Sequence, residues 1–152
     1  MYSLALLLAA TIFYAGYNLL IKQSSVFAEA VAVTTITATI ALQLAALVVS
    51  LVFMMLLRLS GVESFILPAP AYWWAIGAGL CIGAAEICYF YIFAGSPFTA
   101  PVSVNVATPV IVGGAVLVAA LGARLFFGEI MGTRQWLGAG LILVGVIALA
   151  GR

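Results

Sequence analysis

Glu86 is the residue whose type and position most strongly indicate chemistry. It lies in the middle of the apolar stretch GLCIGAAEICYFYIF, far from either end of that stretch. A charge at the centre of a membrane helix costs about 3 kcal/mol on insertion scales, so this carboxyl must be protonated, be paired, or face a wet cavity. Such a group can exchange a proton for a cationic ligand. A protonated Glu that bonds to a neighbouring helix is the structural alternative.

Helical spacing places aromatic and small residues on the face of Glu86. Tyr89 and Phe93 follow it at i+3 and i+7, and aromatic rings beside an acid suit a bound cation. Gly79 and Gly83 form a GxxxG pair, which allows another helix to approach closely. Tyr89 is therefore a candidate binding residue. The alternative is ordinary packing together with an interfacial aromatic belt, and for Phe93 this alternative is the better interpretation.

Asn105 and Pro109 form a second candidate site. Pro109 has no N–H, so the carbonyl of Asn105 loses its helical donor. A free carbonyl beside an amide is what a substrate site in a broken membrane helix uses. A packed proline kink explains the pattern equally well.

Two further apolar stretches carry polar faces. Tyr14, Tyr17 and Asn18 share one helical face through their i, i+3 and i+4 spacing. Gln43 belongs to a polar stripe that also contains Thr35, Thr39 and Ser50. We expect Tyr14, Asn18 and Gln43 to line the same interior space as Glu86, because an amide that faces lipid would be costly.

The composition identifies the elements that must position these residues. Of the 152 residues, 67% are hydrophobic and 6% are charged, against about 25% charged in an ordinary soluble domain. A membrane-spanning helix needs about 20 apolar residues. The sequence therefore predicts an all-α polytopic membrane protein. Charges, glycines and prolines divide it into one unit with five transmembrane helices, at about 3–21, 30–57, 72–94, 101–127 and 135–150.

Local signals refine this division. Lys22 to Ser25 should end the first span, and Pro101 should lie in the first turn of the fourth helix. Small residues predict contacts of the last two helices, with Ala115, Ala119 and Ala123 on one and Gly138 and Gly145 on the other. No Lys or Arg precedes the first stretch, which favours a membrane helix over a signal peptide.

The residue inventory excludes several functions. Histidine is absent and all four acidic residues are Glu, which excludes catalytic His triads, His-bearing zinc sites and paired-Asp hydrolases. Cys81 and Cys88 are too far apart on one helix to form a disulfide. The net charge is +1, without a basic run. We expect no enzyme activity, no cofactor or metal, and no nucleic-acid partner.

The chain from about Ala71 to Gly151 carries a recognisable order of motifs. These are the Ala100-Pro101 entry, Thr108-Pro109, Gly128-Glu129 before a short turn, and Gln-x-x-Gly-Ala-x-Leu-Ile-Leu-x-Gly-Val from Gln135. The order resembles the EamA-type repeat of the drug/metabolite transporter superfamily. That resemblance implies a ten-helix transporter with two inverted five-helix repeats around a central substrate cavity. This chain differs from it in carrying one repeat, and in having Glu86 where the repeat is usually apolar or aromatic.

These features together favour a half-size secondary transporter of the inner membrane. It would move a small metabolite or organic cation, with proton coupling through Glu86 as a further expectation. A non-transporting membrane subunit and a flippase component are the alternatives. An intramembrane enzyme is the least favoured, because the usual nucleophile–base pairs are missing.

The charge distribution bears on assembly. With five spans, one side of the membrane receives Arg58, Arg124 and Arg134, and the other receives Lys22 and Arg152. A bias of three to two weakly favours the N-terminus inside. It fits a short protein with few charges and, equally, a chain that can insert in both orientations. We therefore predict an antiparallel homodimer in which the two Glu86 side chains face one shared cavity. A parallel dimer or a different partner chain is the alternative.

Overall fold

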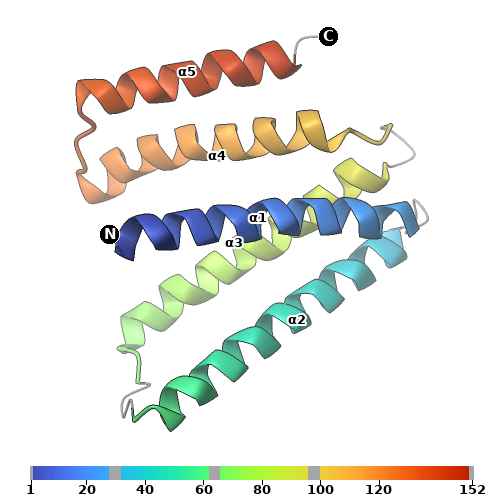
Figure 1. Cartoon of the computed structure of the whole chain (residues 1–152), viewed down its shortest axis with the longest axis vertical. Coiled ribbons are helices and arrows are strands. Elements are labelled where there is room, and N and C mark those ends of the chain that lie inside the picture. Colours follow the sequence, from blue (N-terminus) through green and yellow to red (C-terminus); the bar gives the residue numbers. More distant parts are fainter. Residues whose placement is uncertain (1, 28–31, 62–65, 96–99, 151–152) are drawn as a thin grey trace. The chain divides into compact units, whose positions relative to one another are not determined.

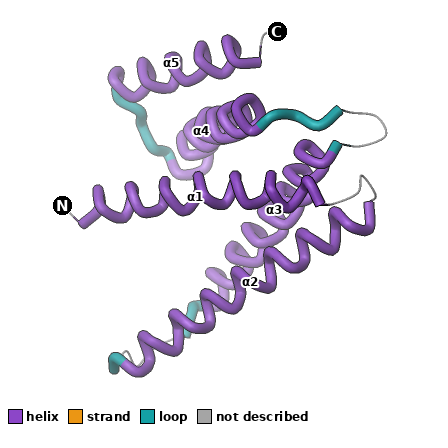
Figure 2. Tube along the Cα trace, turned by 45° about the vertical axis from the view of Figure 1, so that its right-hand side comes forward, coloured by secondary structure: helices purple, strands orange, loops and turns teal. Residues whose placement is uncertain are grey.

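The computed structural model describes residues 2–27, 32–61, 66–95 and 100–150, and these residues form five helices (Figure 1). The helices are α1 (Tyr2–Phe27), α2 (Ala32–Leu59), α3 (Ala69–Ala94), α4 (Val104–Phe127) and α5 (Thr133–Ala150). Within the described ranges the remaining residues are turns and loops, without a strand (Figure 2). Each helix is long and apolar enough to cross a membrane. The predicted all-α fold with five transmembrane helices is confirmed.

Helix α1 continues past the expected end of the first span. The polar segment from Lys22 to Ser25 remains helical, and the helix ends at Phe27. Ser25 Oγ donates a hydrogen bond of 2.8 Å to the carbonyl of Lys22, so this hydroxyl is satisfied within the helix. The polar residues therefore mark the end of the apolar run and not the end of the helix.

Two prolines take different places at helix starts. Pro70 lies in the first turn of α3, where its missing N–H costs no helical bond. Pro101 lies ahead of α4, which corrects the expectation that it belongs to the first turn of that helix. The physical reason is Ser103, which has extended backbone (ψ 148°) at the N-cap and accepts a 2.9 Å bond from the N–H of Ala107.

The chain divides into two units, residues 1–101 and 102–152. In the first unit, α1 and α2 both pack on α3 and make little contact with each other. Its apolar core contains Ile21, Tyr89, Phe90 and Phe93. Its buried polar side chains are Asn18, Ser25, Thr35, Thr39 and Glu86. This unit thus has apolar outer faces and polar groups inside, as expected in lipid.

The second unit is a hairpin of α4 and α5 that packs through small residues. A Cβ atom at Gly113 would lie 2.5 Å from Cγ2 of Val146 and 3.1 Å from Cγ2 of Ile142. Ala107 and Ala139 are also buried. Gly138 and Gly145, the predicted contacts, have no side chain within 4 Å of an added Cβ, and Ala115 and Ala119 are exposed. The close approach of α4 and α5 is therefore made at Gly113, on a different face of α4.

Candidate functional site

The candidate site is centred on Glu86, on the inner face of α3. The Glu86 side chain is 3% exposed, and its Oε2 atom is buried without a hydrogen-bond partner. Among the described residues of the first unit, the basic side chains are Lys22 and Arg58, and neither forms an ion pair with it. A buried carboxyl oxygen without a donor is costly. This oxygen can accept a proton or a hydrogen bond from a cationic ligand.

A cluster of tyrosines surrounds this carboxyl. The Tyr17 hydroxyl from α1 lies beside Glu86. The Tyr17 ring lies edge-on to Tyr89 at 6.2 Å between centroids, and Tyr14 lies 5.4 Å from Tyr17. The hydroxyls of Tyr17 and Tyr89 are buried and make no hydrogen bond to a described residue. Three buried polar atoms from α1 and α3 therefore lie in one small volume, where the Tyr17 hydroxyl interacts with the Glu86 carboxyl.

Lys22 and Phe93 close one end of this cluster. Lys22 Nζ donates a 3.0 Å hydrogen bond to the carbonyl of Phe93 and lies 5.6 Å from the centre of its ring. The carbonyls in the last turn of a helix lack helical donors, and a cation is favourable there. Phe93 is 1% exposed and lies 5.8 Å from Tyr89, so it is a packed core residue, in agreement with the packing interpretation. Lys22 thus fastens the end of α1 to the end of α3.

The other predicted site residues of the first unit lie around Glu86 in different ways. Asn18 is buried, and its Nδ2 donates a 2.7 Å bond to the carbonyl of Tyr14 in its own helix. Gln43 is exposed along α2, but its amide lies against α3, where a Cβ at Gly83 would be 3.2 Å from Nε2. Gly79 has nothing within 4 Å of an added Cβ. Of the GxxxG pair, Gly83 is therefore the residue that provides close approach.

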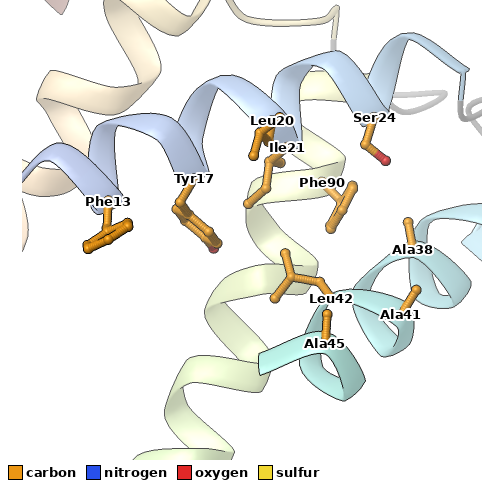
Figure 3. A pocket seen from close by; sticks show the side chains of 10 residues that line it. All are labelled: Phe13, Tyr17, Leu20, Ile21, Ser24, Ala38, Ala41, Leu42, Ala45 and Phe90. Atoms are coloured by element: carbon orange, nitrogen blue, oxygen red, sulfur yellow. The ribbon is translucent and has the colours of Figure 1, made fainter. Parts of the chain in front are cut away.

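Two neighbouring cavities lie beside the tyrosine cluster. The first has a volume of about 440 Å³ and is lined by Ala10, Phe13, Tyr14, Tyr17, Leu42, Ala46, Ile82 and Glu86. The second has a volume of about 450 Å³ and is lined by Phe13, Tyr17, Leu20, Ile21, Ser24, Ala38, Ala41, Leu42, Ala45 and Phe90 (Figure 3). Because Phe13, Tyr17 and Leu42 line both, the cavities are adjacent. Both linings are predominantly apolar; the first includes Glu86, and the second includes Ser24.

Asn105 and Pro109 belong to the second unit. Asn105 is exposed in the first turn of α4, and Pro109 lies inside the helix. Helix α4 continues through Pro109, from Val104 to Phe127. Pro109 lies in the second turn and has no N–H to donate to the carbonyl of Asn105, so the role of this pair stays a prediction.

Tyr17 is the site residue that the sequence did not single out. It shares a helical face with Tyr14 and Asn18, but nothing in that spacing distinguishes it from its neighbours. The structure shows that it lines both cavities and lies beside Glu86. Among the described residues no group of three or more His, Cys, Asp or Glu could hold a metal. The arrangement is suited to binding a cation between a carboxyl and aromatic rings.

Comparison with known proteins gives one distant relative. The chain is 32% identical over 78 residues to the probable 4-amino-4-deoxy-L-arabinose-phosphoundecaprenol flippase subunit ArnE of Aeromonas salmonicida (strain A449). The alignment covers 51% of this chain and 62% of that protein, which is less than two thirds of its length. No family model matches the chain, so the EamA-type resemblance stays a prediction. No solved structure matches it. The chain is thus similar to a small membrane transport subunit.

Proposed function

We propose that this chain is a half-size transporter subunit that moves an amphipathic molecule with a protonated amine across the membrane. The observation that carries the proposal is the buried carboxyl of Glu86, whose Oε2 has no hydrogen-bond partner and which lines a cavity. A protonated amine would supply both the charge and the donors that this carboxyl lacks.

The surroundings of Glu86 support an amine over other ligands. The rings of Tyr17 and Tyr89 offer faces and edges to a cation, and their hydroxyls can accept its hydrogen bonds. Among the described residues of the first unit, the basic side chain nearest the cluster is Lys22, which bonds to the carbonyl of Phe93 at one end of it, so an anionic group beside Glu86 would have no adjacent counter-charge. Without a ligand the carboxyl would hold a proton, and the exchange of that proton for the amine would couple transport to protons.

The relative supports an amphipathic substrate. ArnE is described as a subunit of a flippase for an amino-sugar phosphoundecaprenol, a molecule that carries both an amine and a long hydrocarbon chain. A single five-helix unit cannot surround a central site with two gates, so a second chain is needed. We propose a second copy of this chain as that partner, in the antiparallel arrangement that the weak charge bias favours. A subunit that requires a different partner is the second candidate.

The test is lipid movement by the purified full chain in liposomes. The probes are two acyl-labelled fluorescent lipids, phosphatidylethanolamine with an amine and phosphatidylglycerol without one, read by dithionite quenching. Removing one partner of a buried charge pair costs about 2 kcal/mol or more. We therefore expect the wild-type chain to move the amine lipid, and Glu86→Gln to slow it at least about tenfold.

Glu129→Gln is the matched control, because Glu129 is an exposed acid between α4 and α5. It should transport like the wild type. Equal rates for Glu86→Gln and the wild type would contradict the proposal. A purified wild-type chain that binds the amine lipid and moves none would identify the chain as a subunit that needs a different partner.

A further inference from the structure

Gln43 is a polar side chain that the first unit leaves exposed in the middle of a membrane helix. It lies about 4 Å from the midpoint of α2, which falls between Ala45 and Ala46. Its amide makes no hydrogen bond to a described residue. An amide carries two donors and an acceptor, and the hydrocarbon core holds no water that could satisfy them. This surface of α2 is therefore incomplete without a polar partner.

Neighbouring hydroxyls along α2 do not need such a partner. Thr39 Oγ1 donates a 3.0 Å bond to the carbonyl of Thr35, and Ser50 Oγ donates a 3.0 Å bond to the carbonyl of Ala46. Both bonds close within the helix. The amide of Gln43 instead lies close to Gly83 of α3, which offers no side chain to bond with. Gln43 is thus the polar group in the middle of α2 that needs a group from outside the unit.

Neither lipid nor the α4–α5 hairpin supplies that group. A hydrocarbon chain has no donor or acceptor. The polar side chains of the hairpin helices lie in their first two turns or their last turn: Asn105, Thr108 and Arg124 on α4, and Thr133, Arg134, Gln135 and Trp136 on α5. All of these side chains are attached about 8 Å or more from the middle of their helices. Gln43, near the middle of α2, would therefore meet only apolar side chains of the hairpin.

The partial charges of the amide match those of a second Gln43. A two-fold axis brings the same surface of two chains together, so one residue can face its own copy. The N–H group of each amide then meets the carbonyl oxygen of the other, and both chains satisfy their unpaired groups at once. The neighbouring surface of α3 leaves room for this approach, since Gly79 is exposed and has nothing within 4 Å of an added Cβ. A second copy of this chain is the occupant that fits.

The burial of the first unit indicates how the second copy is oriented. The described buried residues of α1, α2 and α3 all lie in the halves of these helices at the Lys22 end: Asn18, Ile21, Ser25, Thr35, Thr39, Glu86, Tyr89, Phe90 and Phe93. Towards the other end the three helices diverge (Figure 1). The unit is therefore narrow at one end and wide at the other. Two copies in opposite orientations place the narrow end of one beside the wide end of the other, whereas parallel copies would put both wide ends together.

We infer that the outer surface of α2 around Gln43 docks the same surface of a second, oppositely oriented copy, with the two Gln43 amides hydrogen-bonded to each other. The inference rests on the proposed function for the presence of a second copy, and it adds the surface and the residue through which the copies meet. Ile36 and Ser50 lie seven residues before and after Gln43, so they share its face of the helix, and both are exposed. An antiparallel pair centred on Gln43 therefore brings Ile36 of each chain close to Ser50 of the other.

The experiment is disulfide cross-linking between co-expressed full-length copies that carry different tags. Cys81→Ser and Cys88→Ser remove the native thiols, both of which are exposed. One copy carries Ile36→Cys and the other Ser50→Cys, so Gln43 itself stays in place. We expect this mixture to form an oxidised dimer, and each variant expressed alone to form at least several-fold less. Val52→Cys replaces Ser50→Cys in the control, because Val52 is 51% exposed on the opposite side of α2. It should cross-link to Ile36→Cys several-fold less.

Variants of Gln43 test the amide pair itself. Gln43→Leu in both copies should lower cross-linking of Ile36→Cys to Ser50→Cys several-fold, because it removes both hydrogen bonds. Gln43→Asn keeps an amide on a shorter side chain and should lower it less. Thermal unfolding of each variant in detergent checks the fold. Gln43→Asn keeps the test valid if Gln43→Leu does not fold.

Three results would overturn the inference. Stronger cross-linking of Ile36→Cys and Ser50→Cys each with itself would show a parallel pair. Absence of any cross-link between chains would show that a second copy does not dock on this surface. Cross-linking that Gln43→Leu leaves unchanged would show that the amides do not pair.

The lipid assay separates this inference from the proposed function. If Glu86→Gln slows movement of the amine lipid and no cross-link forms, the docking surface is wrong and the proposed function stands. If the cross-links form as expected and Glu86→Gln transports normally, the docking surface stands and the transport role of Glu86 is wrong.

Discussion

The two units of the chain bury different kinds of residue. The three-helix unit encloses a carboxyl, an amide and several hydroxyls among Glu86, Asn18 and the threonines of α2. The buried residues of the α4–α5 hairpin are Ala107, Gly113 and Ala139, which offer no side chain that can bind a ligand. In the hairpin, small residues let two helices approach, whereas in the first unit polar residues fill the space between helices.

This difference suggests that the residues able to bind a ligand and the residues that only pack helices together lie in different units. Buried polar groups in a membrane protein are costly, so a unit that retains several of them without full hydrogen bonding has a use for them. A contact made by glycine and alanine gains its stability from close packing alone. The comparison favours ligand binding by α1, α2 and α3, in line with the proposed function, and structural support by α4 and α5. The following predictions test that assignment.

The largest expected effect is on stability, at Gly113. Replacing Gly113 with Val should destabilise the protein by about 2 kcal/mol or more, because its side chain would overlap Val146 and Ile142. Gly114→Val is the control, since nothing lies within 4 Å of a Cβ at Gly114. Thermal unfolding in detergent should show a melting temperature lower by about 4 °C or more for Gly113→Val alone. Binding of the amine lipid below that temperature should be retained, and its loss would break the proposed division of roles.

A smaller effect, on function without loss of stability, is expected at Tyr17. Tyr17→Phe keeps the ring and removes a buried hydroxyl that has no hydrogen-bond partner. Since an unsatisfied buried hydroxyl is costly, the melting temperature should stay the same or rise. Movement of the amine lipid should fall about three- to tenfold, equivalent to the loss of one hydrogen bond of about 1 kcal/mol.

Tyr14→Phe provides the comparison for Tyr17→Phe, because Tyr14 is 47% exposed at the rim of the same cavity. It should have a smaller effect on transport. A Tyr17→Phe chain with unchanged transport would show that this hydroxyl does not touch the substrate.

The smallest effect is expected at Pro109. Pro109→Ala restores one helical hydrogen bond in the second turn of α4, so stability should hold or rise by about 1 kcal/mol. If the hairpin is a scaffold, movement of the amine lipid should remain within about twofold of the wild type, a change of less than about 0.5 kcal/mol. A several-fold decrease in movement of the amine lipid without loss of stability would indicate that Asn105 and Pro109 take part in binding. It would contradict the proposed division of roles between the two units.

The sequence predicted the helices better than their contacts. The apolar composition, divided by charges, glycines and prolines, predicted five membrane helices, because apolar stretches of about 20 residues are typical of membrane spans. The sequence also singled out Glu86, since an acid in mid-span is rare, and the structure shows that this residue is buried. Pro101 was placed wrongly because a proline can either occupy the first turn or precede the N-cap, and the extended backbone of Ser103 decided between the two.

Contacts between helices depend on rotations about the helix axes that spacing does not reveal. The glycines and alanines of the last two helices offered several faces, and the structure uses the one with Gly113. The position of Tyr17 in both cavities depends on how α1 and α2 each pack on α3, which no local sequence pattern encodes. Lys22 presents the same difficulty, because its partner is a backbone carbonyl 71 residues away in the sequence.

The position of Glu86 along α3 has a consequence for depth in the bilayer. The midpoint of α3 falls between Cys81 and Ile82, so Glu86 lies about 7 Å beyond it, at 1.5 Å per residue. If two chains paired in opposite orientations with their α3 helices centred in the membrane, the two carboxyls would lie about 14 Å apart along the membrane normal. Each carboxyl would then lie nearer one leaflet, and the predicted shared cavity would contain two separate binding positions. A substrate headgroup would cross the low-dielectric centre in a single step from one acid to the other.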